Sequence, residues 1–252
     1  MRHHRKNNCI VTAVILFISD LHLAPERPAT TARFIHFLRT HARHAQQLYI
    51  LGDLFDAWIG DDDDTPLQRD ICAALRDLTA AGVDCAIVPG NRDFLLGRAF
   101  FRTSGCQRLR DLTLLNCGGE STVLLHGDLL CSDDVAYQRF RRHVHNPLLQ
   151  QLFLWQPLAK RRALAQHYRQ RSMTATAEKT LEIMDVNPAT VATTLRRFDA
   201  TQMVHGHTHR PADHLDNGAT RRVLAAWDEV NGGEVLVLEP AAVNKWHRKS
   251  II

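Results

Sequence analysis

Carboxylate, imidazole and amide side chains recur in short polar motifs, and each motif directly follows an apolar run. Imidazoles and carboxylates together suit Mn, Fe or Zn rather than Ca²⁺, which prefers a shell of oxygens. Two such cations that share one carboxylate can activate water against a phosphate ester or anhydride, so the set predicts two-metal hydrolytic chemistry. The motifs are Asp20-x-His22, Gly52-Asp53-x-x-Asp56, Gly90-Asn91-Arg92-Asp93, His126-Gly127-Asp128 and Gly206-His207-Thr208-His209.

Each motif alone has an ordinary structural explanation. Asp53 could cap a helix, Asn91 could sit in a turn, and residues 206–209 could form a surface loop with two histidines. Five such motifs, each after an apolar run, are not explained by five separate structural needs. We therefore predict one joint metal site. We expect the pairs 20/22 and 207/209 on extended segments, where both side chains of a pair point the same way.

Short apolar runs alternate with helical patterns, which is typical of α/β layering. Apolar spacing predicts helices over Thr30–Ala45 and Pro66–Ala81, and Asn187 before Pro188 is typical of a helix start. Active sites of open α/β sheets lie at the carboxyl ends of strands, where the polar motifs fall. The predicted strands are Ala13–Ile18, Leu48–Leu51, Cys85–Val88, Thr122–Leu125, Met203–His205, Val223–Ala226 and Val235–Leu238.

Composition favours a globular protein with an anionic ligand. The 252 residues are 45% hydrophobic, and the net charge of +4 suits an anion without requiring a nucleic-acid polymer. The basic start and the apolar run 9–18 imitate a signal peptide, but the run is too short to span a bilayer and no cleavage site follows. We predict a disordered basic extension over residues 1–12 and one domain over residues 13–252.

The six cysteines are scattered and include no C-x-x-C pair, so we expect reduced, mostly buried thiols rather than disulfides or a zinc ribbon. They are Cys9, Cys72, Cys85, Cys106, Cys117 and Cys131. The acidic run Asp61–Asp64 predicts a solvated loop.

The stretch 135–177 departs from the alternating pattern, since it holds eight Arg or Lys, three His and no acidic residue. It predicts an inserted helical subdomain. An apolar block from Leu148 to Leu158 lies inside it, between two basic flanks. The flanks are Arg139, Arg141, Arg142, Lys160, Arg161 and Arg162.

The five motifs, in this order, resemble the calcineurin-like metallophosphoesterases, whose pattern is D-x-H, G-D-x-x-D, G-N-[HR]-D, H-G and G-H-T-H. The match extends from residue 20 to residue 209. The resemblance implies a four-layer α/β fold, in which two mixed β-sheets form a sandwich flanked by helices, with a dinuclear centre at the strand ends. One metal would be held by Asp20, His22, Asp53 and His209, and the other by Asp53, Asn91, His126 and His207.

Within that superfamily, segments 51–56, 90–95, 126–128 and 183–187 resemble the family of diphosphatases that act on UDP-2,3-diacylglucosamine in bacterial lipid A synthesis. The resemblance implies hydrolysis to UMP and 2,3-diacylglucosamine 1-phosphate, with two Mn²⁺ per subunit and water attacking the uridine-side phosphorus. It implies a cytoplasmic protein peripheral to the inner membrane, with a lipid-linked UDP-sugar as substrate and neither nucleic acid nor an obligate protein as partner. Implied catalytic residues are Asp53, Asn91, Arg92, His126 and His207; implied substrate residues are Asn91, Arg92, Asp134, Ser172, Thr176, Lys179 and His207, with Asn common in the family at position 176.

Arg92 departs from the His that is commoner at this position of the superfamily. Arginine stays protonated, so it can clamp phosphate but cannot practically donate a proton to a leaving group. A departing phosphate monoester needs little acid help. Arg92 therefore favours a pyrophosphate substrate over the alkoxide leaving group of a nuclease.

The insert leaves two interpretations open. A substrate with two acyl chains needs an apolar groove, which the block from Leu148 to Leu158 could supply, or the block could pack a small core of its own. The basic flanks could rest on anionic lipid or simply face solvent. One rival function is an enzyme of soluble nucleotides, such as a nuclease or dinucleoside polyphosphate hydrolase, and another is a non-enzymatic scaffold. Arg92 and the few aromatic residues available for base stacking argue against the first, and the complete ligand set argues against the second.

Overall fold

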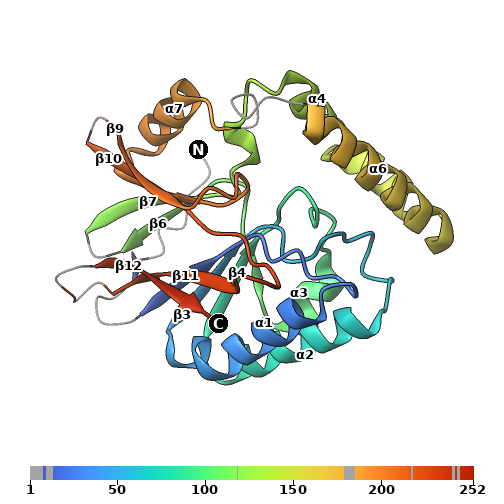
Figure 1. Cartoon of the computed structure of the whole chain (residues 1–252), viewed down its shortest axis with the longest axis horizontal. Coiled ribbons are helices and arrows are strands. Elements are labelled where there is room, and N and C mark those ends of the chain that lie inside the picture. Colours follow the sequence, from blue (N-terminus) through green and yellow to red (C-terminus); the bar gives the residue numbers. More distant parts are fainter. Residues whose placement is uncertain are drawn as a thin grey trace.

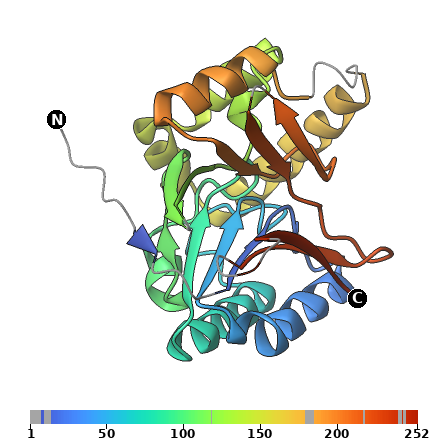
Figure 2. The same ribbon diagram turned by 90° about the vertical axis from the view of Figure 1, so that its left-hand side faces the viewer.

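Two mixed sheets pack face to face in the computed structural model, which describes residues 8–9, 14–117, 119–178, 185–216, 218–239, 242 and 245–252. Helices cover the outer face of each sheet (Figure 1 and Figure 2). The chain therefore has the predicted four-layer α/β arrangement. In the part of the chain that the structure describes, no helix combines the length and apolar composition needed to cross a bilayer.

The first sheet has the strand order β12-β11-β2-β3-β4-β5. Its central strands β2 (Ile15–Ile18), β3 (Gln47–Leu51) and β4 (Asp84–Val88) are parallel, so their carboxyl ends lie at one edge of the sheet. The outer strands are β5 (Gln107–Arg108), β11 (Gly233–Leu238) and β12 (Trp246–Ile251).

The second sheet has the order β1-β6-β7-β8-β10-β9. Strands β7 (Glu120–Leu124) and β8 (Gln202–His205) are parallel neighbours at its centre, and β10 (Ala219–Val223) runs parallel to β8. The remaining strands are β1 (Asn8–Cys9), β6 (Thr113–Cys117) and β9 (Ala212–Asp216).

Two strand predictions differ from the structure. The predicted strand Val223–Ala226 is wrong, because β10 ends at Val223 and the chain then crosses to the first sheet. Leu224 N still donates to His205 O at 2.7 Å, and Trp227 is buried at the end of this crossing, against Phe34 and Phe37. Asn8–Cys9 pairs with β6, where we expected disorder; the rest of the predicted extension lies outside the described residues.

The alternating side chains of the strands build three apolar layers. Phe17, Leu51 and Leu124 belong to the layer between the sheets. The opposite face of the first sheet packs on α1 (Pro28–Thr40), α2 (Pro66–Ala80) and α3 (Arg98–Ser104). Helix α7 (Pro188–Phe198) packs on the second sheet, and Asn187 caps it as predicted.

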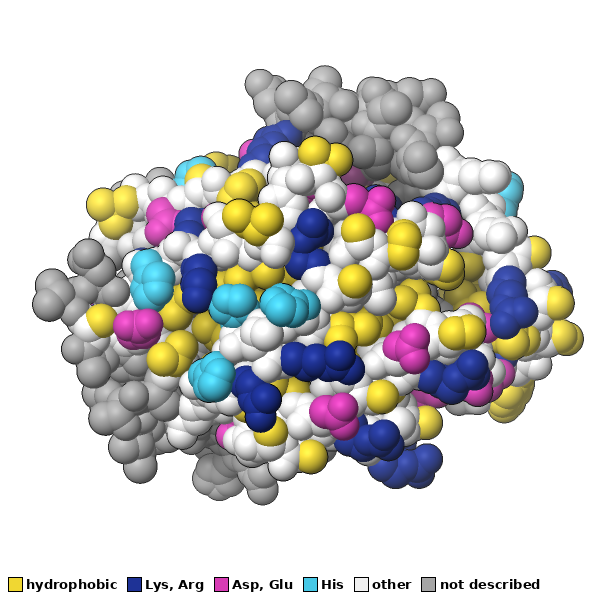
Figure 3. Space-filling model, turned by 60° about the horizontal axis from the view of Figure 1, so that its bottom comes forward, with side chains coloured by type: hydrophobic (Ala, Val, Ile, Leu, Met, Phe, Trp, Pro, Cys, Tyr) yellow, Lys and Arg dark blue, Asp and Glu magenta, His cyan; other side chains and the backbone are white. Residues whose placement is uncertain are grey.

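The outer surface of the helices that cover the first sheet carries both charged and apolar side chains. Figure 3, in which the lower side of Figure 1 comes forward, shows basic, acidic and histidine side chains interspersed with small apolar areas.

After α1, a short 3-10 helix, η1 (Ala42–His44), replaces the last turn of the helix predicted over Thr30–Ala45. The cysteines with described side chains are free thiols, as predicted: Cys72, Cys85, Cys106 and Cys131, the last three buried.

Three helices occupy the stretch predicted as an insertion, after a 3-10 turn η2 (Asp128–Leu130): α4 (Val135–Val144), α5 (Pro147–Leu154) and α6 (Leu158–Glu178). In Figure 1, α6 extends away from the sandwich. Leu148, Leu152 and Trp155 are 75%, 53% and 73% exposed, so these three side chains do not pack a core of the insert. Phe153 instead contacts the core of the first sheet.

The acidic run 61–64 is not the solvated loop that we predicted. Asp63 is buried, and Asp62 and Asp63 form ion pairs with Arg161 and Arg162 of α6. Two residues of the basic flanks, Arg141 and Arg161, are buried rather than exposed. Opposite charges 99 residues apart in sequence neutralise each other here, which a local pattern does not reveal.

Candidate metal centre

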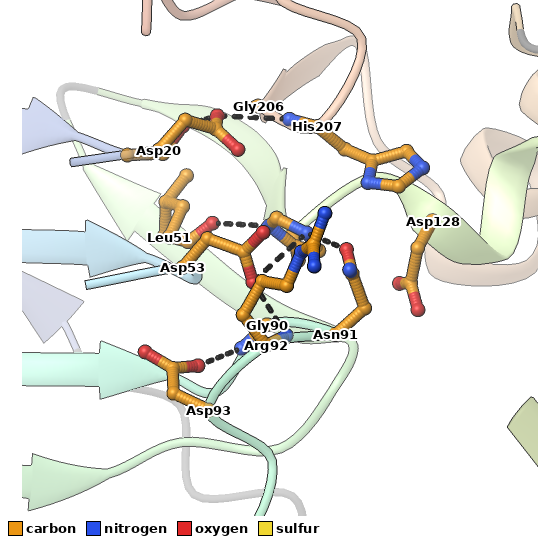
Figure 4. Close-up of polar contacts among 12 residues, drawn as sticks. Asp20, Leu51, Asp53, Gly90, Asn91, Arg92, Asp93, Asp128, Gly206 and His207 are labelled. Carbon is orange, nitrogen blue, oxygen red and sulfur yellow. Dashed lines mark hydrogen bonds and ion pairs between the residues drawn. The ribbon is translucent and has the colours of Figure 1, made fainter. Parts of the chain in front are cut away.

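The five polar motifs lie at the carboxyl ends of five strands, as predicted. Strands β2, β3, β4, β7 and β8 end two or three residues before the expected ligand positions 20, 53, 91, 126 and 207. Figure 4 shows Asp20, Asp53, Asn91 and His207 around one space at these strand ends. Backbone hydrogen bonds join neighbouring motifs, from Asp20 N to Gly52 O at 3.1 Å and from Gly206 N to His126 O at 2.7 Å. Across the sheets, His207 N donates a hydrogen bond to Asp20 Oδ2 at 2.9 Å, so the two sheets share one site.

Asp20, His22 and His209 form a first group of ligand atoms within 4.8 Å of one another. His209 Nε2 lies 3.3 Å from Asp20 Oδ1, and the Nε2 atoms of His22 and His209 are 3.3 Å apart. Both imidazoles and the carboxylate therefore converge on one point, as the ligands of a transition metal do.

Asp53 faces both sides of the centre. Its Oδ2 lies 3.8 Å from His22 Nδ1, and its Oδ1 lies 3.7 Å from His126 Nε2. Asn91 Oδ1 is 2.8 Å from the same His126 nitrogen, and the rings of His126 and His207 are 5.0 Å apart. Asp20, Asp53 and His126 form a second group of ligand atoms within 4.8 Å of one another, which shares Asp20 with the first group.

The donors present fit divalent cations. Asp20 Oδ1 and His22 Nδ1 are buried and have no hydrogen-bond partner among the described residues. Buried polar atoms nearly always have a hydrogen-bond partner, so two such atoms without one, beside a carboxylate and a second imidazole, fit a bound cation. His126 Nδ1 donates to the Leu51 carbonyl at 2.9 Å, which leaves Nε2 directed at the centre, as in metal-ligating histidines generally.

Burial disfavours charge throughout the centre, and neighbouring groups modify this effect. Burial raises the pKa of Asp53 to about 7, although His126 opposes the shift. Burial lowers the pKa of His22 to about 3 and that of His207 to about 4. Burial would also lower the pKa of His126, but the carboxylate of Asp53 contributes most to raising it to about 9. His22 and His207 are therefore neutral at pH 7, with lone pairs free for a cation.

The backbone at five expected ligand positions is left-handed, so our prediction of extended segments for the pairs 20/22 and 207/209 is wrong. The chain turns sharply where each strand ends, and these turns aim the side chains inward. Each such conformation costs on the order of 1–3 kcal/mol and persists where surrounding contacts impose it, often at functional sites. The φ angles are 55° at Asp20, 48° at His22, 52° at Asp53, 70° at His207 and 54° at His209.

Glycines permit the close approach of these turns. A Cβ at Gly206 would collide with the side chains of Ser19 and Asp20, and one at Gly90 would collide with Asp53. The sequence showed a glycine in four of the five motifs but not this contact.

Gly206→Ala is expected to lower metal affinity about tenfold or more, because the added methyl displaces the Asp20 carboxylate. Calorimetric titration with Mn²⁺ measures this affinity. Gly82→Asn is the control, since nothing lies within 4 Å of a Cβ at Gly82 and Asn tolerates its positive φ. Equal affinities in both variants would contradict the role of Gly206.

The expected substrate residues are only partly placed by the structure. Arg92 is half-buried at the centre, its amide donates to Asp53 Oδ1 at 2.8 Å, and its charge contributes to lowering the pKa of His22. Asp134 caps α4 by accepting from Tyr137 N at 3.0 Å. The side chains of Ser172 and Thr176, and the whole of Lys179, lie outside the described residues.

Two aspartates without an assigned role support the site. Asp93 is buried and accepts from Gly90 N at 2.7 Å and Leu54 N at 2.8 Å, so it ties two ligand loops together. Asp128 accepts from Tyr137 Oη at 2.7 Å and from Arg141 Nε at 2.5 Å, which connects the His126 loop to α4. Both aspartates stand within the sequence motifs, and this placement was the available signal.

Comparison with known proteins agrees with this geometry. A sequence profile described as calcineurin-like phosphoesterase matches residues 13–211. The UDP-2,3-diacylglucosamine hydrolase of Serratia proteamaculans is 53% identical over 88% of this chain and 94% of its own, and that of Yersinia enterocolitica is 50% identical over the same shares. Vacuolar protein sorting 29 of Cryptosporidium parvum aligns over 94% of this chain and 96% of its own, with a TM-score of 0.47 and 13% identity. The chain therefore belongs to the calcineurin-like phosphoesterase family.

Proposed function

We propose that this protein hydrolyses the pyrophosphate bond of UDP-2,3-diacylglucosamine in lipid A biosynthesis, to UMP and 2,3-diacylglucosamine 1-phosphate. The observation that carries the proposal is the Asp53 carboxylate, which faces a ligand group on each side at the strand ends. The names and extensive identity of the Serratia and Yersinia relatives support the choice of substrate.

Two divalent cations, which we propose to be Mn²⁺, would occupy the centre. When bound, they would supply an activated water and neutralise charge on the phosphoryl oxygens. Asp53 would bridge them, and its position between His22 and His126 supports this role. The first cation would be held by Asp20, His22, Asp53 and His209, and the second by Asp53, Asn91, His126 and His207.

Arg92 would bind and orient the pyrophosphate. Its guanidinium stays protonated at any physiological pH, so it stabilises phosphoryl charge and does not act as an acid. The attack would fall on the uridine-side phosphorus, and the lipid-side phosphate would leave without protonation. The residues that we propose to bind the substrate are Asn91, Arg92, Asp134, Ser172, Thr176, Lys179 and His207.

The exposed side of α5 would receive the acyl chains. Leu148, Leu152 and Trp155 together present apolar surface that a soluble protein normally covers, and two acyl chains would cover it. A substrate embedded in a bilayer also brings the protein to the membrane surface. We propose a peripheral association with the cytoplasmic face of the inner membrane, without a spanning helix.

Product analysis tests the function directly. The purified protein is incubated with UDP-2,3-diacylglucosamine and, separately, with a dinucleoside polyphosphate, each with and without Mn²⁺. Mn²⁺-dependent release of UMP and the lipid monophosphate, with little attack on the dinucleotide, is the expected result. Hydrolysis of the dinucleotide alone would assign the centre to soluble nucleotides instead.

Leu152→Asp is expected to raise KM for the lipid substrate about tenfold, because it places a charge where acyl chains would bind. Turnover of a short chromogenic phosphodiester should change less than about twofold. Leu215→Asp is the matched control, since Leu215 is equally apolar and 76% exposed but lies on β9. Equal losses on both substrates would contradict an acyl-binding role for α5.

A further inference from the structure

The loop of residues 58–64, between the Asp53–Asp56 motif and α2, binds the start of α6. We name this loop the acidic loop. The carboxylate of Asp61 in this loop accepts hydrogen bonds from the backbone N–H groups of Gly97 and Ala99, at 2.9 and 2.8 Å. Both N–H groups lie at the start of α3. The Nε1 of Trp58 donates to the same carboxylate at 3.1 Å. The acidic loop is therefore fixed to the catalytic domain before it meets the insert.

Arg161 of α6 is the centre of this contact. Its guanidinium is 2% exposed and forms a two-pronged ion pair with Asp62, in which Nη1 lies 2.8 Å from Oδ1 and Nη2 donates to Oδ2. The same group donates to the Ile59 carbonyl at 2.7 Å and, through Nε, to the Gln156 carbonyl at 3.0 Å. One side chain thus joins the acidic loop to the turn between α5 and α6.

Two further contacts join the acidic loop to the ends of α5 and α6. Arg162 Nη2 donates to the buried carboxylate of Asp63 at 2.5 Å. A Cβ at Gly60 would collide with the Arg161 guanidinium and lie 3.0 Å from Leu154 Cδ2, so the absence of a side chain there admits both. The last residue of α5 and the first turn of α6 are therefore in direct contact with the acidic loop.

We propose that Asp62 and Arg161 are positioning residues, which hold the exposed apolar face of α5 in a fixed orientation relative to the metal centre. They thereby determine the selectivity of the protein for lipid-linked over soluble substrates. This inference rests on the proposed function. Neither residue touches the centre. They act through the α5–α6 turn. This turn begins at Trp155 and joins α5, which carries the exposed Leu148 and Leu152, to α6.

Besides the ion pair of Arg169 with Asp56 at 2.8 Å further along α6, two anchors hold the insert on either side of α5. Arg141 of α4 pairs with Asp128 beside His126, which fixes the beginning of the insert. Arg161 fixes the α5–α6 turn, and the apolar face of α5 lies between the two anchors. A buried arginine that loses its carboxylate leaves an uncompensated charge, so loss of Asp62 drives Arg161 towards water and releases the turn.

Asp62→Asn is the test, measured as separate KM and kcat values for UDP-2,3-diacylglucosamine and for a short chromogenic phosphodiester in Mn²⁺. KM for the lipid substrate should rise about tenfold, with kcat and the phosphodiester reaction changed less than about twofold. Asp62 is largely exposed in its side chain, so the variant is expected to fold. Arg161→Lys keeps the charge but loses the two-pronged geometry, and should show a smaller rise in KM.

Asp64→Asn is the matched control, because Asp64 belongs to the same loop but, among the described residues, forms its ion pair with the exposed Arg69 and not with α6. Its KM should equal that of the wild type. An unchanged KM for Asp62→Asn, or equal losses on both substrates, would overturn the positioning role. Wild-type protein that does not act on the lipid substrate would instead refute the proposed function. Hydrogen exchange of the α5–α6 amides should increase in Asp62→Asn and not in Asp64→Asn, whatever the substrate proves to be.

Discussion

Asp53→Asn is expected to lower kcat by about three orders of magnitude or more, the largest effect of any single substitution in this protein. Asn has nearly the same volume, so it can keep the oxygen that accepts from Arg92 N at 2.8 Å and fits against Gly90. It lacks the negative charge that a carboxylate shared between two cations supplies. Steady-state turnover in saturating Mn²⁺ measures the loss.

Asp70→Asn controls for the removal of one negative charge, since Asp70 is exposed on α2. Its turnover should equal that of the wild type. A rate for Asp53→Asn within about tenfold of the wild type, with both cations bound, would refute the bridging role.

Although Asp53→Asn should lower kcat, it should raise the stability of the metal-free protein above pH 7. The pKa of Asp53 is raised to about 7 by burial, so ionising it costs folding free energy. That cost begins above the unfolded pKa of roughly 4 and is complete above the folded pKa. At pH 8 in chelator, Asp53→Asn should therefore melt at a higher temperature than the wild type, and at pH 4 the difference should vanish.

The positions of the ligands along the strands could be predicted because each depends on a local pattern. An apolar run such as Leu48–Leu51 must be buried, and a polar motif after it must lie at the edge of the sheet. The four-layer fold was implied by the resemblance of the ordered motifs to the calcineurin-like metallophosphoesterases, and the structure confirms it. Strands β6, β9 and β12 were missed, because Thr113–Cys117, Ala212–Asp216 and Trp246–Ile251 mix polar and apolar residues without a clear alternation.

Features that depend on partners distant in sequence could not be predicted. The left-handed backbone at Asp20 and His22 is imposed by contacts such as His22 N to Asp53 O at 2.9 Å. Asp62 and Arg161 are each typical of a solvated surface when considered alone, and only their tertiary contact buries the guanidinium. The exposed face of α5 likewise depends on how the insert is anchored, not on the apolar content of the helix.

Removal of divalent cations should abolish activity and lower thermal stability. Asp20 Oδ1 and His22 Nδ1 have no hydrogen-bond partner among the described residues, so the metal-free fold contains buried ligand atoms that a cation would satisfy. A cation present at about 100 times its Kd stabilises the folded state by about 2.7 kcal/mol, which corresponds to a rise in Tm on the order of 5–10 °C for a domain of this size. Activity and melting temperature after chelation and after addition of Mn²⁺ measure both effects.

Activity and thermal stability should be restored by some divalent cations and not by others. Imidazole nitrogens from His22, His126 and His209 bind Mn²⁺ and Zn²⁺ in preference to Ca²⁺, so Ca²⁺ should restore neither activity nor stability. His22→Ala should remove the rise in Tm, because it deletes a donor of the first group, whereas His44→Ala, at an exposed position of η1, should keep it. Full activity in chelator would refute two-metal catalysis. A rise in Tm with Ca²⁺ equal to that with Mn²⁺ would place the cation on carboxylates alone, away from the histidines on which the proposed centre depends.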